Sequence, residues 1–228
     1  MRIIALVFIL SGLFGATSVR AGEVIDRIVA SVNGHVILAS EVDEAVSYQA
    51  FADNRACNLI VPDQHKAALD RLIDQELIRE EVHGSDYEPA SPAEVDSRIA
   101  DLRKLHADVA DEGSWLRALD GCGLSAAELR EQVTGELNSW KAVETRLRPN
   151  VAIDSRSVER YYQQNFLPQL RRRGASEIPL SAVAAEIKEI LAQQQINDLL
   201  TAWLKSLRTE SNIQIAFVAS IAPAGGSR

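Results

Sequence analysis

The chain has 228 residues, 46% of them hydrophobic and 25% charged, which is enough to bury the core of one large domain or two small ones. Its formal charge of −8 at pH 7 makes nucleic acid a poor partner, because binding to phosphates needs a positively charged face. The only basic cluster is the arginine run 171–173, which is typical of a solvated loop.

The first 21 residues are typical of a secretory signal peptide. Arg2 supplies the positive end, residues 3–14 are rich in apolar side chains, and Ala21 is a small residue suited to cleavage. This apolar stretch is short against the roughly 20 residues needed to cross a bilayer, so an uncleaved anchor is the weaker interpretation. We expect export, cleavage near Ala21 and no membrane span afterwards. Removal of Arg2 and Arg20 changes the formal charge from −8 to −10.

Residues 24–38 predict a β-hairpin. The pair Asn33-Gly34 is a strong signal for a two-residue turn, because both turn positions need a positive φ. The two strands are then expected at 24–32 and 35–38. Polar side chains within them indicate a small, exposed sheet rather than a buried one.

Hydrophobic residues at spacings of three and four predict a helical body after the hairpin. Three pairs have the spacing of a capping box, in which a serine is followed three residues later by an acid: Ser40 with Asp43, Ser91 with Glu94, and Ser125 with Glu128. The expected helices are 41–52, 63–83, one that begins at Pro92, 113–119, one that Pro149 closes, and 155–166. Residues 167–178 are expected to form a basic loop.

The C-terminal part predicts one long helix followed by a strand. Apolar residues repeat with a helical period over 180–208, and a helix of that length would extend roughly 43 Å. After it, Ile213, Ile215 and Phe217 alternate with other residues, as in a strand. Because a lone strand is unstable, we expect it to pair with the N-terminal hairpin. Residues 218–228 are expected to be a disordered tail.

The two cysteines, Cys57 and Cys122, fall in predicted loops. In an exported protein an even number of cysteines permits a disulfide; the alternative is two separate thiols, one of them buried. A bridge would span 65 residues and stabilise the protein by about 4 kcal/mol in the chain-entropy model.

Residues for catalysis or metal binding do not form a recognisable pattern. The four histidines are scattered, and His65 and His83 share a predicted helix without the spacing of a metal site. A glycine-rich phosphate loop, a nucleophile elbow and a Cys-x-x-Cys motif are all missing from the sequence. We therefore expect neither a metal nor a cofactor.

Several segments together resemble the N-terminal chaperone domain of SurA-type periplasmic proteins. They are VIDRIVASVNGHVILASEVD from Val24, ALDRLIDQELIREE from Ala68, SPAEVDSRI from Ser91 and LSAAELREQV from Leu124. Residues 178–217 are similar to the helix and strand that follow the isomerase module in this family. The resemblance covers 24–166 and 178–217.

The resemblance implies a mainly α fold over residues 22–217, in which a small N-terminal hairpin is joined by a C-terminal strand after a long helix. Family members normally carry a parvulin isomerase domain before that last helix. Here the interval 167–178 holds 12 residues, too few for a domain to fold. The family's catalytic residues are therefore not carried over, and we expect no enzyme activity.

The resemblance also implies a function: a periplasmic, ATP-independent holdase that binds unfolded exported polypeptides, with outer-membrane protein precursors as candidate clients. Such a module binds extended segments in an apolar cleft between helices and through hydrogen bonds at sheet edges. The candidate client-binding residues are Trp115, Leu116, Trp140 and Trp203, although tryptophans are more often core anchors. The alternatives are a scaffold subunit with one dedicated partner and, less favoured, a residual peptidyl-prolyl isomerase.

Overall fold

The computed structural model describes residues 26–57, 61–82, 87–106 and 109–216. Within these ranges the chain is mainly α-helical and carries one three-stranded antiparallel sheet, which confirms the predicted fold class. The expected signal peptide 1–21 and the expected tail 218–228 lie outside the described residues. No helix of the described part is long and apolar enough to span a bilayer.

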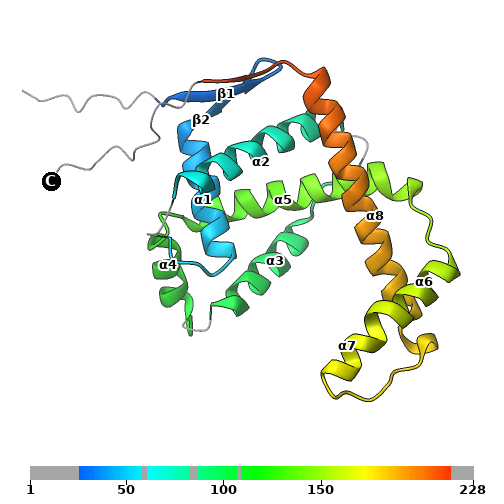
Figure 1. Ribbon diagram of the computed structural model, residues 1–228. Helices are drawn as coiled ribbons and strands as arrows, with labels where there is room; N and C mark the ends of the chain where they lie inside the picture. Colours follow the sequence, from blue (N-terminus) through cyan, green and yellow to red (C-terminus); the bar gives the residue numbers. More distant parts are fainter. Residues whose placement is uncertain (1–25, 58–60, 83–86, 107–108, 217–228) are drawn as a thin grey trace, which may run out of the picture.

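The predicted hairpin consists of β1 (Ile28–Val32) and β2 (His35–Leu38). At the turn, Asn33 and Gly34 have φ values of 50° and 98°, the left-handed conformation that a two-residue hairpin turn requires. The strand order is β2-β1-β3, and β3 (Ile213–Ile215) is antiparallel to β1. The C-terminal strand therefore returns to the N-terminal hairpin, as predicted, and β2 is an outer strand of the sheet (Figure 1).

Two helices lie beneath the sheet: α1 (Ala39–Ala52) and α2 (Pro62–Glu81). The expected capping box of Ser40 with Asp43 is wrong. The Glu41 carboxylate accepts the Leu38 amide at 2.6 Å, so α1 begins earlier, and the Ser40 hydroxyl donates to Asp26 instead. Glu41 is the third residue of the helix and Leu38 is the residue before it, so this hydrogen bond is the one that a capping box makes to the amide before the helix. Leu38 takes the position that serine usually has.

The next three helices are α3 (Pro92–Leu105), α4 (Glu112–Asp120) and α5 (Ala126–Leu147). The capping boxes predicted at Ser91 and Ser125 are confirmed, because each serine accepts the amide three residues later and each glutamate accepts the serine amide. Large apolar residues of these helices form one core cluster with the end of α1. Its least exposed members are Phe51, Leu102, Leu119, Leu129 and Val133.

The first half of the expected loop 167–178 is a helix, and the second half is a turn and an extended connection. A short 3-10 turn (Arg148–Asn150) and α6 (Ser155–Tyr161) lead through a π-helical turn (Tyr162–Phe166) into α7 (Leu167–Arg172). Leu167 and Leu170 both pack in the cluster that joins this corner to Ile187. Residues three apart share one face only in a helix, so burial of these two leucines selects the helical conformation.

The long helix α8 (Leu180–Glu210) follows Pro179 and extends over 31 residues, roughly 46 Å. It packs on three clusters in turn: Ile187 contacts the α6–α7 corner, Ile196 packs against α2 and α5, and Leu207 packs under the sheet. Near its end, Arg208 donates to Asp74 at 2.7 Å. The helix therefore connects the α6–α7 corner to the sheet (Figure 1).

Candidate functional site

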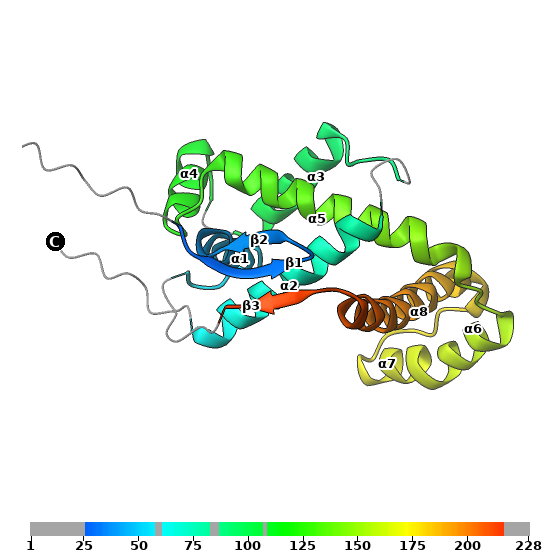
Figure 2. The ribbon, with the colours of Figure 1, turned by 90° about the horizontal axis from the view of Figure 1, so that it is seen from above.

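A cleft of about 340 Å³ lies between β2, α2 and α5. Figure 2 looks onto the sheet and shows β2 on the α5 side, with β3 on the opposite side. Apolar side chains line the cleft from the strand (Ile37), from α2 (Leu72 and Ile78) and from the residue that follows α2 (Val82). The cleft therefore places an apolar wall directly beside an outer strand of the sheet.

The α5 wall of the cleft is built mainly from small residues, with Asn138 as its largest side chain. Gly135, Ser139 and Ala142 are spaced by four and three, so they share one side of the helix and line the cleft. A Cβ added at Gly135 would meet no heavy atom within 4 Å. The cleft is open because α5 lines it with no large apolar side chain.

One carboxylate lies at the polar side of the cleft. Glu76 is 7% exposed and is the only buried charged residue in the described part of the chain. The Arg79 guanidinium donates to both of its oxygens, with a distance of 2.7 Å from Nε to Oε2, and His35 Nδ1 lies 3.7 Å from Oε1. The hydrogen bond to Glu76 raises the pKa of Arg79, so the guanidinium stays charged. Burial of Glu76 is thus offset by a paired cation.

At the outer edge of β2, the backbone N–H and C=O of one residue, Val36, have no partner strand among the described residues. Val32 and His35 flank the two-residue turn, so they form the hydrogen-bonded pair, and the next pair, Ser31 with Val36, is not hydrogen-bonded. The N–H and C=O of Val36 consequently point away from β1. The next outward amide, that of Leu38, is already bonded to Glu41. The edge beside the cleft can therefore accept one residue of an added strand.

The four candidate client-binding residues do not line this cleft, and one of them is in the core. Trp115 is 4% exposed, its ring centroid lies 5.2 Å from that of Phe51, and the Arg103 guanidinium lies 5.5 Å from the same tryptophan ring. The expected contact of Trp115 with clients is replaced by the core role that tryptophan usually has. A side chain with this little exposure has no surface for a client.

The other three candidates are on separate helices. Leu116 on α4 is 46% exposed and Trp140 on α5 is 41% exposed. Trp203 on α8 is half-buried between two core clusters, with the Arg146 guanidinium 6.0 Å from its ring. The structure therefore leaves Leu116 and Trp140 as exposed apolar side chains, and it does not bring the candidates together.

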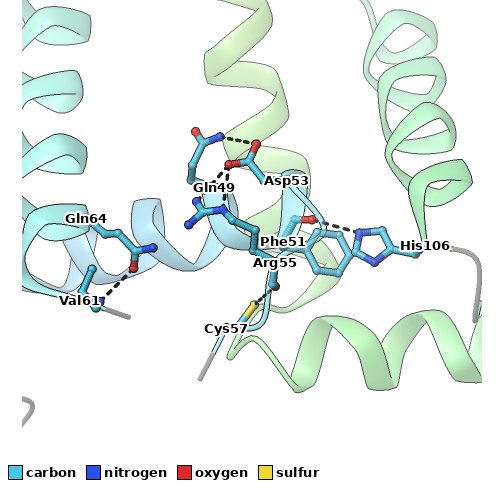
Figure 3. Close-up of polar contacts among 8 residues, drawn as sticks. All are labelled: Gln49, Phe51, Asp53, Arg55, Cys57, Val61, Gln64 and His106. Carbon is cyan, nitrogen blue, oxygen red and sulfur yellow. Dashed lines mark hydrogen bonds and ion pairs between the residues drawn. The ribbon is translucent and has the colours of Figure 1, made fainter. Parts of the chain in front are cut away.

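Cys57 and Cys122 lie side by side in the structure. Their Cα atoms are 5.1 Å apart and their sulfur atoms are at bonding distance, the arrangement of a disulfide. Figure 3 shows Cys57 after the end of α1, where the His106 ring stacks on Phe51 with centroids 4.2 Å apart and its Nε2 lies 3.1 Å from the Phe51 carbonyl oxygen. The pair therefore joins the connection between α1 and α2 to the connection between α4 and α5.

Sequence reasoning missed the residues that form the cleft. Gly135 carried a signal, since glycine inside a helix costs about 1 kcal/mol relative to alanine and needs a reason. Glu76 and Val36 carried none, because their positions depend on how β2 lies against α2. In the described ranges, no group of three or more histidine, cysteine or acidic residues is arranged to hold a metal.

Comparison with known proteins identifies the relatives of this chain. A family model described as the SurA-like N-terminal domain matches residues 1–142. Chaperone SurA of Chromohalobacter salexigens is 28% identical over 142 residues, which are 61% of this chain and 32% of that protein, so the chain spans about a third of its relative. A solved structure from a study of PEB4 and Cj1289, two SurA-like chaperones of Campylobacter jejuni, covers 83% of this chain and 99% of its own at 11% identity, with a TM-score of 0.47.

Proposed function

This chain belongs to the family of SurA-like N-terminal domains, and from that premise we propose that it acts as a periplasmic, ATP-independent holdase. Its clients are unfolded exported polypeptides, with outer-membrane protein precursors as the first class to test. Binding uses burial of apolar client side chains, which needs no nucleotide and no catalytic group.

The observation that carries this proposal is the open cleft beside β2. An unfolded polypeptide exposes apolar side chains and unpaired backbone amides. The apolar wall of the cleft can contact the side chains, and the free edge of β2 can form hydrogen bonds with the backbone. Leu116 and Trp140 are additional contact points on other surfaces, supported by their exposure. The formal charge of −8 helps to keep a complex with an apolar client soluble.

We propose no isomerase activity for this chain. Between Arg172 and Leu180 the described chain makes only a short connection, where family members normally insert the isomerase module. A refolding assay limited by proline isomerisation should therefore proceed at its uncatalysed rate in the presence of the chain. Acceleration above that rate would contradict this part of the proposal.

The test is suppression of aggregation when a urea-denatured outer-membrane protein is diluted into buffer. The chain at equimolar concentration should keep the client in solution, and Trp140→Ala and Leu116→Ala should each weaken this effect. Lys188→Ala changes an exposed polar residue of α8 and serves as the matched control. Aggregation unchanged by the wild-type chain would overturn the proposal. Capture of one folded stoichiometric partner without such clients would instead favour the scaffold role.

A further inference from the structure

We propose that the free edge of β2 takes up an extended client segment as an added strand, which places two client side chains in the cleft and favours a lysine or arginine beside Glu41. This inference rests on the proposed function.

The backbone of β2 limits how the segment can bind. Val36 directs its N–H and C=O away from β1, so it can exchange two hydrogen bonds with one residue of an added strand. Glu41 accepts the next outward amide, that of Leu38, at 2.6 Å and so ends the ladder there. The added strand is consequently short, and most of its binding must come from side chains.

The side chains of the segment alternate between two faces. Those opposite His35 and Ile37 point to the same face as these two residues, and both line the cleft. The client residue opposite Val36 lies on the outer face, where Val36 itself is 41% exposed. A segment with apolar residues at alternate positions therefore fits, whereas a helix does not, because only an extended chain can pair with the edge.

The charges around the cleft select among extended segments. Glu41 and Glu76 contribute two carboxylates, and Arg79, which is paired with Glu76, contributes the one arginine or lysine of the lining. Glu41 is exposed at the strand edge and takes part in none of the ion pairs of the described residues. A lysine or arginine of the client can form an ion pair with the Glu41 carboxylate, whereas a glutamate of the client is repelled by it.

The probe is a fluorescein-labelled nine-residue peptide that alternates valine with threonine and carries one central lysine. A second peptide carries glutamate in place of that lysine. Fluorescence anisotropy should show the lysine peptide binding about threefold more tightly at low salt, a preference that high salt removes. Glu41→Gln should abolish the preference while keeping the cap on the Leu38 amide, because a glutamine side chain also accepts a hydrogen bond.

Two further variants test the cleft and the edge. Gly135→Phe fills the cleft and should weaken binding of the lysine peptide about tenfold, whereas Ala127→Phe places the same ring on an exposed site of α5 outside the cleft and should leave binding unchanged. Val36→Pro removes the outward donor, which a strand edge tolerates, and should weaken binding about fivefold. Circular dichroism verifies that each variant is folded.

The outcomes separate this inference from the proposed function. Wild-type affinity in Gly135→Phe, or equal affinity for the two peptides in the wild type, would overturn strand addition even if the chain suppresses aggregation of a denatured client. Peptide binding with the expected variant pattern but without suppression of aggregation would support strand addition and overturn the holdase role. If Val36→Pro fails to fold, Gly135→Phe and Glu41→Gln still decide the question.

Discussion

Helix α5 has one side that faces α3 and α4 and another that faces α2 and β2. On the first side, Leu129 and Val133 are 1% and 0% exposed and contact other large side chains. On the second, Gly135 and Ser139 leave the space that becomes the cleft. One helix thus completes a closed core on one side and holds open a site on the other.

The closed side is also the more heavily braced. The Cys57–Cys122 pair ties two connections together there, and the rings of Phe51, His106 and Trp115 pack against one another. In the described part of the chain, the open side has one ion pair, between the buried Glu76 carboxylate and the exposed Arg79, and a strand edge at which the backbone of Val36 is unpaired. The difference indicates that apolar residues stabilise the fold where large partners cover them, and are free for binding where the facing residues are small.

The largest expected effect is loss of the disulfide on the closed side. The bridge spans 65 residues, so replacement of Cys57 and Cys122 by serine should lower the free energy of unfolding by about 4 kcal/mol. Urea unfolding with and without reductant measures this change, and the double variant should be insensitive to the reductant. A wild-type protein equally stable in both conditions would contradict the bracing of this side.

Truncation of a core residue on the same side comes next. Leu129→Ala should lower the free energy of unfolding by about 3 kcal/mol, because it leaves a cavity among large neighbours. Leu105→Ala removes the same atoms from a residue that is 52% exposed, and should cost less than about 0.5 kcal/mol. Similar losses in both variants would mean that this side is not closed.

On the open side, a larger side chain should raise the free energy of unfolding rather than lower it. Gly135→Ala should raise the free energy of unfolding by about 0.8 kcal/mol, since the new Cβ has free space and alanine favours the helix. Gly123→Ala is the contrasting substitution, because φ of +69° makes any side chain there strained and destabilising. A loss of stability in Gly135→Ala would show that the cleft is filled.

The smallest effect concerns pH and an exposed ion pair of the closed side. The Lys141 ammonium, and then the Ser91 amide, lower the pKa of Glu94 from 4.5 to about 2. A lowered pKa gives stability that is present above about pH 4.5 and is lost as pH falls towards about 2. The advantage of wild type over Glu94→Gln in urea unfolding should therefore disappear across that range. The control is Glu131→Gln, and an advantage that persists at pH 2 would contradict the assignment.

Much of the fold could be predicted because its signals are local. Asn33-Gly34 specifies its own turn, and the capping boxes at Ser91 and Ser125 specify helix starts within four residues. The start of α1 was misplaced because Glu41 competes with Asp43 for the capping role. The helix at Leu167–Arg172 was missed because Pro168 and the arginine run resemble a loop, while packing on α8 decides the outcome.

The site was less predictable, because it depends on side chains that are small or distant in sequence. Trp115 and Trp140 have the same side chain, but tertiary neighbours bury one and leave the other 41% exposed. The cleft arises where Gly135 and Ser139 fail to fill the space beside Ile37, and hydrophobic periodicity cannot register a missing side chain.

Photo-crosslinking from the cleft tests most directly whether an unfolded chain lies between β2 and α5. The photoreactive amino acid p-benzoylphenylalanine replaces Ser139 in the cleft or, as the control, Ala127 on the exposed first turn of α5. With a denatured outer-membrane protein as client, we predict a crosslinked product from position 139 and only background from position 127. Equal labelling from both positions, or none from position 139 while the client stays bound, would contradict the account.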